Sequence, residues 1–402
     1  MLPLNQIVET PCYIIDEVTF KDNYKYIYQS FENYLYGGKL TVGYSVKTNH
    51  NTEMIKYAHN MGMLAEVVSD DEYDLTLLCG YASNEIIFNG PQKSEKKLIQ
   101  ALKDGSIVNI DNLHEIDMIQ RNISDLCVKN VKIGLRVNFD LEGVCPSETT
   151  AGKDVSRFGL CFENGDLLVA IQRLNSMGIA VSGLHMHYSS RTRSVKIFEE
   201  LSKCAGQIIN EYGLTESIRY IDIGGGFFMG ENRSLEGKPT MEQYAATICK
   251  TLSRVINLNM IELIIEPGAS LIASSIQYIC SVINKRDIRG TSVLTCDGST
   301  LHINPFIAKR TPIYEVIRVH ESNSKRAHQI ICGATCMEAD RICELTDEAE
   351  VDIGDYIVCR CVGAYTMAFN NTFINLPPYI YWYDGTNYEP VRKKTLETMQ
   401  MI

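Results

Sequence analysis

The segment TVGYSVKTNHNTEMIKYAHNMGMLAEVVS (41–69) contains a short apolar run, a stretch with helical periodicity and a second apolar run. Apolar runs rich in β-branched residues and separated by an amphipathic stretch are typical of a strand–helix–strand unit. The alternation continues along the chain, and eight runs read as strands: TVGYSVK (41–47), LAEVVS (64–69), EIIFNG (85–90), SIVNID (106–111), KIGLRVN (132–138), GLHMHYSS (183–190), YIDIGGG (220–226) and LIIEPGAS (263–270).

Eight strands that alternate with helices indicate parallel pairing with crossover connections. Their number, and a span of roughly 250 residues, predict an α/β fold with a closed (β/α)₈ barrel of the TIM type. An open, doubly wound parallel sheet is the competing architecture.

The pattern of predicted elements changes after about residue 275. Strand-like runs follow one another with no long helix between them: IQYICSVINK (276–285), TSVLTCD (291–297), YEVIRVH (314–320), HQIICGA (328–334) and DYIVCRCVGAY (355–365). Such a run of strands predicts a C-terminal antiparallel β domain. We expect the early run PCYIID (11–16) to join it, so that residues 20–272 form the barrel and residues 1–19 with 273–402 the β domain.

Composition and charge indicate which kinds of partner the protein is not expected to bind. The net charge is −11 and the basic residues form no long run, which argues against nucleic acid or an anionic membrane as the main partner. No apolar run has the length of a membrane span, and the N-terminus lacks the pattern of a secretory signal. The 14 cysteines are scattered without CxxC pairs, so we expect reduced thiols, no structural metal and a cytoplasmic protein.

Polar residues collect at the expected C-terminal ends of the barrel strands, where TIM-type barrels place their chemistry. They include Lys47, Ser69, Asn89, Arg136, His187, Ser190 and Glu266. A lysine that ends a strand at a cavity is partly desolvated, which lowers its pKa and favours imine formation with a carbonyl compound. An exposed lysine at the start of a loop is the alternative for Lys47.

Three further features fit a phosphorylated aromatic cofactor. Gly224, Gly225 and Gly226 follow a strand, and glycines allow backbone N–H groups to approach a phosphate, although a plain tight turn needs the same residues. His185 and His187 share one face of a strand; stacking of a histidine on a ring fits better than a metal site, and buried core histidines are the other alternative. Glu266 could keep a heterocyclic nitrogen protonated, which makes a pyridine ring an electron sink.

Together these motifs resemble a known family, the pyridoxal 5′-phosphate (PLP) decarboxylases with the alanine-racemase fold, which include the diaminopimelate, ornithine and carboxynorspermidine enzymes. YSVKTN, HYSS, IDIGGGF, EPG, GATC and GAYT follow in the family's order, and the likeness covers the chain from Thr10 to Thr366. It implies a barrel that binds PLP, a β domain and a homodimer with shared active sites.

The resemblance also implies roles for individual residues. Lys47 would be the Schiff-base lysine, Glu266 would face the pyridine nitrogen, and His187 would cover the ring. The remaining cofactor contacts would be Glu66, Arg136, Ser190, Gly224, Gly225, Gly226 and Tyr365. Cys336 of the neighbouring subunit, or Lys47, would protonate the substrate carbon after CO₂ leaves.

Departures from the family pattern bear on the substrate. Ala269 follows EPG where the family commonly has arginine, Ser189 stands where a glycine is usual, and Met337 replaces an acidic residue after Cys336. We therefore expect a decorated amino acid of a specialised or polyamine/lysine-type pathway rather than simple ornithine, lysine or diaminopimelate, with Glu338 and Asp340 as substrate contacts.

The prediction is thus a PLP-dependent amino-acid decarboxylase. An amino-acid racemase on the same fold and a catalytically inactive regulatory homologue are the alternatives, and a metal-dependent barrel hydrolase is a more distant one. The presence of Lys47, Glu266, His187 and Cys336 together argues against an inactive copy.

Overall fold

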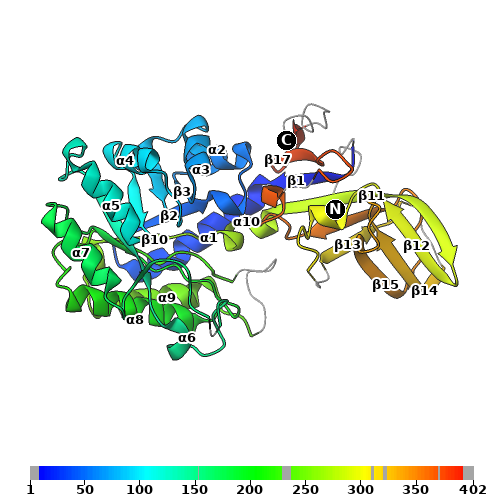
Figure 1. The fold of residues 1–402 in the computed structure, drawn as a ribbon. Coiled ribbons are helices and arrows are strands. Elements are labelled where there is room, and N and C mark those ends of the chain that lie inside the picture. The colour runs from blue at the N-terminus through cyan, green and yellow to red at the C-terminus, as the bar shows by residue number, and fades with distance from the viewer. Residues whose placement is uncertain are drawn as a thin grey trace. The chain divides into compact units, whose positions relative to one another are not determined.

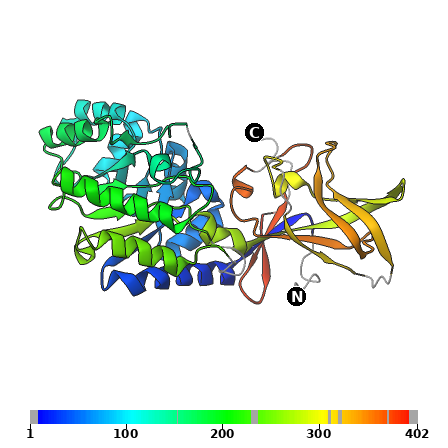
Figure 2. The same ribbon diagram turned by 90° about the horizontal axis from the view of Figure 1, so that it is seen from below.

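The structure, a computed structural model, describes residues 9–152, 154–228, 237–308, 312–319, 324–369 and 372–392 (Figures 1 and 2). The chain divides into two compact units, one from Tyr24 to Ser270 and one formed by the residues up to Asn23 together with those from Leu271 onward. We propose that these units are the two domains of the protein.

The first unit is a closed parallel barrel. Eight strands pair with their neighbours in register, and the pairing of β5 with β6 and of β10 with β2 closes the ring. The strands are β2 (Lys39–Ser45), β3 (Leu64–Val67), β4 (Ile86–Phe88), β5 (Ile107–Ile110), β6 (Lys132–Asn138), β8 (Gly183–His185), β9 (Tyr220–Asp222) and β10 (Glu262–Ile265). Each lies within, or within two residues of, one of the eight predicted runs, so the barrel is confirmed and the open sheet is wrong. A short strand, β7 (Leu160–Cys161), pairs with β6.

Helices follow most of these strands and lie outside the barrel (Figure 1). They are α1 (Glu17–Leu35), α2 (Thr52–Asn60), α3 (Asp70–Leu78), α4 (Glu95–Lys103), α5 (Leu113–Arg121), α6 (Leu141–Val144), α7 (Asp166–Ser176), α8 (Val195–Glu211), α9 (Met241–Leu252) and α10 (Ala269–Ile272). Side-chain caps explain where several begin, because Asn51, Ser69 and Ser94 each accept a backbone N–H from the first turn. In the described part of the chain, no helix combines the length and apolar character that crossing a membrane requires.

The second unit is built on one large sheet in the order β15-β14-β12-β11-β1-β17-β18, with β16 beside β11 and β13 beside β16. Its strands are β1 (Cys12–Asp16), β11 (Ile276–Ile288), β12 (Thr291–Cys296), β13 (Ile313–Ile317), β14 (Lys325–Cys332), β15 (Arg341–Ala349), β16 (Tyr356–Arg360), β17 (Tyr379–Tyr383) and β18 (Tyr388–Arg392). The run at residues 11–16 does join this sheet, since β1 pairs antiparallel with β11 and parallel with β17. With a second parallel pair, β12 with β14, the sheet is mixed and not purely antiparallel.

Candidate active site

Lys47 stands directly after β2, in a short 3₁₀ turn formed by Val46–Thr48. Its ammonium group pairs with the carboxylate of Glu66, and Ser45 lies opposite Glu66 in the ladder between β2 and β3. The Lys47 side chain is 31% exposed, whereas that of Glu66 is 1% exposed. Lys47 therefore reaches the end of the barrel beside a buried negative charge and does not extend freely into solvent.

Glu266 follows β10 at the same end of the barrel and is buried. Its Oε1 accepts a hydrogen bond of 2.6 Å from Nδ2 of Asn89 and lies 3.7 Å from Nε2 of His185. The same Nδ2 donates to Oε1 of Glu66 at 3.1 Å. One amide thus links the carboxylate that pairs with Lys47 to the carboxylate expected to face a ring nitrogen.

Glu266 and its buried neighbour Asp222 have pKa values shifted in opposite directions. Burial alone would raise the pKa of Glu266, but His185 and Lys47 hold that pKa well below its usual range. Burial, together with the charge of Glu266, holds the pKa of Asp222 well above its usual range. The carboxylate form of Glu266 is therefore favoured, which suits a cationic partner, whereas the neutral acid form of Asp222 is favoured.

His185, Asp222 and Glu266 also offer ligand atoms that all lie within 4.8 Å of one another. These three side chains come together because β8, β9 and β10 are adjacent in the barrel, and His187 is not among them. The prediction of no metal remains a prediction. An ion at this position would take the carboxylate that a pyridine nitrogen needs.

His187 lies against the glycine turn. Its ring is inclined by 23° to that of His185, with centroids 6.2 Å apart, and its Nδ1 accepts the N–H of Gly225 at 3.0 Å. Burial lowers the pKa of His187 to about 3, so the imidazole is neutral. A neutral aromatic ring in a fixed orientation is suited to stacking on a planar cofactor.

The glycines of the turn are required by close packing. A Cβ on Gly225 would lie 2.1 Å from the carbonyl oxygen of Glu266, and a Cβ on Gly224 would lie 2.5 Å from the Cβ of His187. Gly224 and Gly226 have φ of +73° and +95°, in the region that favours glycine. The turn therefore ties the expected phosphate site to Glu266 and His187, the two side chains expected at the ring.

We expect Gly225→Ala to weaken PLP binding by about 100-fold or more, because the added methyl group displaces the Glu266 backbone. Gly43→Ala in β2 is the matched control, since its Cβ would meet nothing closer than 3.4 Å. Titration of both purified variants with PLP, followed by absorbance, measures the effect. Equal affinities would contradict this reading of the turn.

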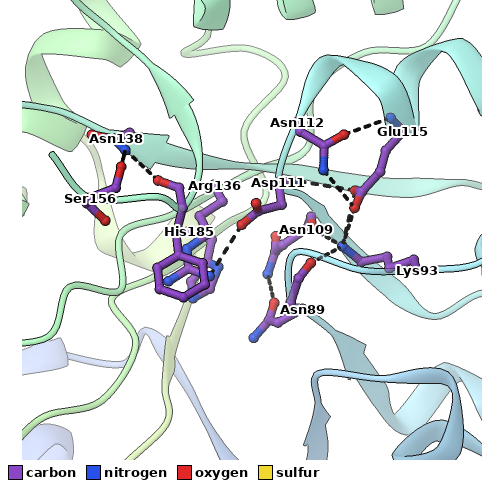
Figure 3. Close-up of polar contacts among 12 residues, drawn as sticks. Asn89, Lys93, Asn109, Asp111, Asn112, Glu115, Arg136, Asn138, Ser156 and His185 are labelled. Atoms are coloured by element: carbon purple, nitrogen blue, oxygen red, sulfur yellow. Dashed lines mark hydrogen bonds and ion pairs between the residues drawn. The ribbon is translucent and has the colours of Figure 1, made fainter.

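Two residues that are predicted to contact the cofactor, Arg136 and Ser190, also make contacts within the protein. The guanidinium of Arg136 lies 3.3 Å from the carboxylate of Asp111 (Figure 3). It also lies 4.5 Å from the ring centroid of Phe158. Ser190 accepts the N–H of Arg193 through Oγ at 2.9 Å, which leaves its hydroxyl hydrogen free to donate. Arg136 is therefore anchored in the barrel, and Ser190 keeps a donor for an anion.

The other predicted site residues belong to the second unit. Cys336 and Glu338 are exposed, and Tyr365 has φ of +57°. Asp340 is buried, and its carboxylate accepts hydrogen bonds from Ser299, from the backbone of Thr300, and from the backbone and hydroxyl of Thr335. These four bonds involve both oxygens and shape the Cys336 loop, which gives Asp340 a structural role. Its predicted contact with substrate remains a prediction.

Sequence reasoning assigned no role to Asn89, Asp222, Asn109 or Tyr220. Their positions carried a partial signal, because Asn89 directly follows the β4 run and Asp222 directly precedes the glycine turn. The contacts of these residues depend on which strands are neighbours, and only the closed barrel shows which strands are neighbours.

Comparison with known proteins agrees with this geometry. Residues 23–273 match the family model described as "Pyridoxal-dependent decarboxylase, pyridoxal binding domain". The chain belongs to this family. Diaminopimelate decarboxylase of Bacillus methanolicus is 27% identical over 99% of this chain and 93% of that protein, and the Bacillus subtilis enzyme is 27% identical over 96% and 90%. The solved diaminopimelate decarboxylase of M. jannaschii has a TM-score of 0.84 at 23% identity, over 98% of this chain and 91% of that one.

The chain is accordingly a PLP-dependent amino-acid decarboxylase. Its own residues fit the cofactor, because a lysine beside a buried carboxylate, a second ionised carboxylate, a neutral imidazole and a glycine turn meet at one end of the barrel. Bound PLP supplies the electron sink for the electron pair released when CO₂ leaves.

Proposed function

We propose that this chain removes the α-carboxylate of an amino acid, with Lys47 as the residue that holds PLP and Glu266 as its ring-nitrogen partner. The observation that supports this most directly is the bridge of Asn89 between the carboxylate paired with Lys47 and Glu266. A lysine and an ionised carboxylate in one buried network are the two groups that the chemistry needs at opposite ends of the ring.

Each residue has a distinct part in the proposal. Lys47 would be attached to the cofactor at rest, and Glu266 would keep the ring nitrogen cationic. His187 would cover one face of the ring, while backbone N–H groups of the glycine turn and Ser190 would bind phosphate. After CO₂ leaves, a proton from Cys336 or Lys47 would reach the substrate Cα and complete the product amine.

Two substrates are candidates. The named relatives support diaminopimelate, because several curated diaminopimelate decarboxylases align over nearly the whole chain. Ala269 and Met337, in place of a common arginine and a common acidic residue, favour a decorated amino acid with a different distal group. We take diaminopimelate as the first substrate to test and the decorated amino acid as the second.

A second copy of the chain is the proposed partner. Large apolar side chains of the second unit are exposed, and the rings of Phe306 and Phe369 contact edge to face at 4.7 Å. Exposed apolar groups of this kind are typical of an interaction surface. We propose that this surface pairs with a second subunit, which would bring Cys336 to the neighbouring site; the cytoplasmic location remains a prediction.

A CO₂-release screen tests the proposal. Purified protein loaded with PLP is offered meso-diaminopimelate, lysine, ornithine, and carboxyalkylated amino acids, and both CO₂ and product are measured. We expect one CO₂ per amine formed, and Cys336→Ala should lower kcat by about 100-fold with cofactor still bound, while the exposed Cys127→Ala leaves it unchanged. Protein that stays colourless with PLP, or that racemises substrates without CO₂, would overturn the proposal.

A further inference from the structure

Three buried side chains form a line of hydrogen bonds that leads to the two site carboxylates. The hydroxyl of Tyr220, in β9, donates to Oδ1 of Asn109, in β5, at 2.8 Å. Nδ2 of Asn109 donates to Oδ1 of Asn89 at 2.8 Å, a contact drawn in Figure 3. Nδ2 of Asn89 then donates to Glu66 and to Glu266. Tyr220 and Asn109 have no part in the reaction proposed above, and Asn89 enters it only as the bridge between the two carboxylates.

The donor and acceptor of each bond follow from the groups at the two ends of the line, the Tyr220 hydroxyl and the two carboxylates. Carboxylates only accept, so the amide nitrogen of Asn89 must face Glu66 and Glu266, and its oxygen must face Asn109. Asn109 in turn has to present its nitrogen to Asn89 and its oxygen to Tyr220. Burial holds the pKa of Tyr220 well above its usual range, so the phenol keeps the proton that it donates.

The barrel interior is shaped to hold this line. A Cβ on Gly183 would lie 2.1 Å from Cζ of Tyr220, and a Cβ on Gly134 would lie 2.1 Å from Oδ1 of Asn109. The buried ammonium of Lys93 donates to the backbone oxygen of Asn109 at 3.0 Å and is itself paired with Glu115 at 3.1 Å (Figure 3). Two strands thus lack side chains where the phenol and amide lie, and an ion pair anchors the end of β5.

We propose that Tyr220, Asn109 and Asn89 are positioning residues which orient the two amide hydrogens of Asn89 toward Glu66 and Glu266. These hydrogen bonds keep Glu266 ionised, so that the proton between Glu266 and the cofactor's ring nitrogen stays on the nitrogen. A hydrogen bond to the ionised form of an acid favours that form. Without the donor, Glu266 competes better for the proton, and the ring becomes a weaker electron sink. The proposal rests on the proposed roles of Lys47 and Glu266.

The test compares two buried phenols of the barrel. Tyr220→Phe removes only the hydroxyl at the start of the line, and Asn89→Leu removes both donors at its end. Tyr73→Phe is the matched control, because the Tyr73 hydroxyl is also buried and bonds Ser106 at 2.9 Å, outside the line. Each protein is loaded with PLP labelled with ¹⁵N in the ring, and the ¹⁵N chemical shift reports the position of the proton.

We expect Tyr220→Phe to raise the ratio of unprotonated to protonated ring nitrogen by about tenfold. The kcat should fall in proportion to the loss of the protonated ring, with KM nearly unchanged. Asn89→Leu should have the larger effect, and Tyr73→Phe should keep the wild-type spectrum even where its Tm falls by a similar amount. Wild-type ¹⁵N shifts in a folded, PLP-bound Tyr220→Phe protein would overturn the inference alone. A wild-type protein that binds no PLP through Lys47 would overturn the proposed function as well.

Discussion

Replacement of Lys47 by arginine is expected to abolish CO₂ release while the barrel stays folded. Arginine keeps the positive charge beside Glu66, so the ion pair at the end of β2 is retained. A guanidinium stays protonated at neutral pH and therefore does not form an imine, so covalent attachment of the cofactor is lost. We expect kcat/KM to fall by about 10⁴-fold or more.

Two measurements separate this loss from misfolding. The visible absorbance of lysine-bound PLP should be absent from Lys47→Arg, and borohydride treatment followed by mass mapping should label Lys47 in the wild type only. Lys39→Arg, at the other end of the same strand and paired with Glu262 at 2.8 Å, should behave as the wild type. Residual covalent labelling at another lysine would show that Lys47 is not the attachment site.

Replacement of Glu266 by glutamine is expected to leave PLP attached but to lower kcat by about 100- to 1000-fold. The glutamine oxygen can still accept the Asn89 hydrogen bond, so the packing around Asn89 is retained. The negative charge is lost, however, and an uncharged amide does not hold the ring nitrogen as a cation. The electron pair left by CO₂ then has a poorer acceptor.

The effect of Glu266→Gln is measured as kcat at saturating substrate together with the spectrum of bound PLP. Glu262→Gln is the control, because Glu262 lies at the opposite end of β10 and pairs with the exposed Lys39. Its activity should stay within about twofold of the wild type. A Glu266→Gln enzyme with normal kcat would mean that this carboxylate does not serve the ring.

Local patterns were sufficient to predict the elements and to propose several site residues. Alternating apolar runs and amphipathic stretches located all eight barrel strands, because burial of a strand on both faces requires a continuous apolar run. Lys47 and Glu266 were proposed because each lies toward the C-terminal end of such a run, where side chains of a barrel face its open end. The mixed sheet of the second unit was not found, since strand direction depends on pairing between distant segments such as β12 and β14.

What the sequence by itself determined is therefore the class of fold, the family and the positions that end each strand, since these depend on residues close together in the chain. The tertiary structure alone decided that Asn89 bridges Glu66 and Glu266, that the pKa of Asp222 is raised beside Glu266, and that Asp340 hydrogen-bonds to Thr300 and Thr335. These outcomes depend on burial and on contacts across as many as 177 positions of sequence, and hydrogen-bond geometry at that range is set only when the barrel closes.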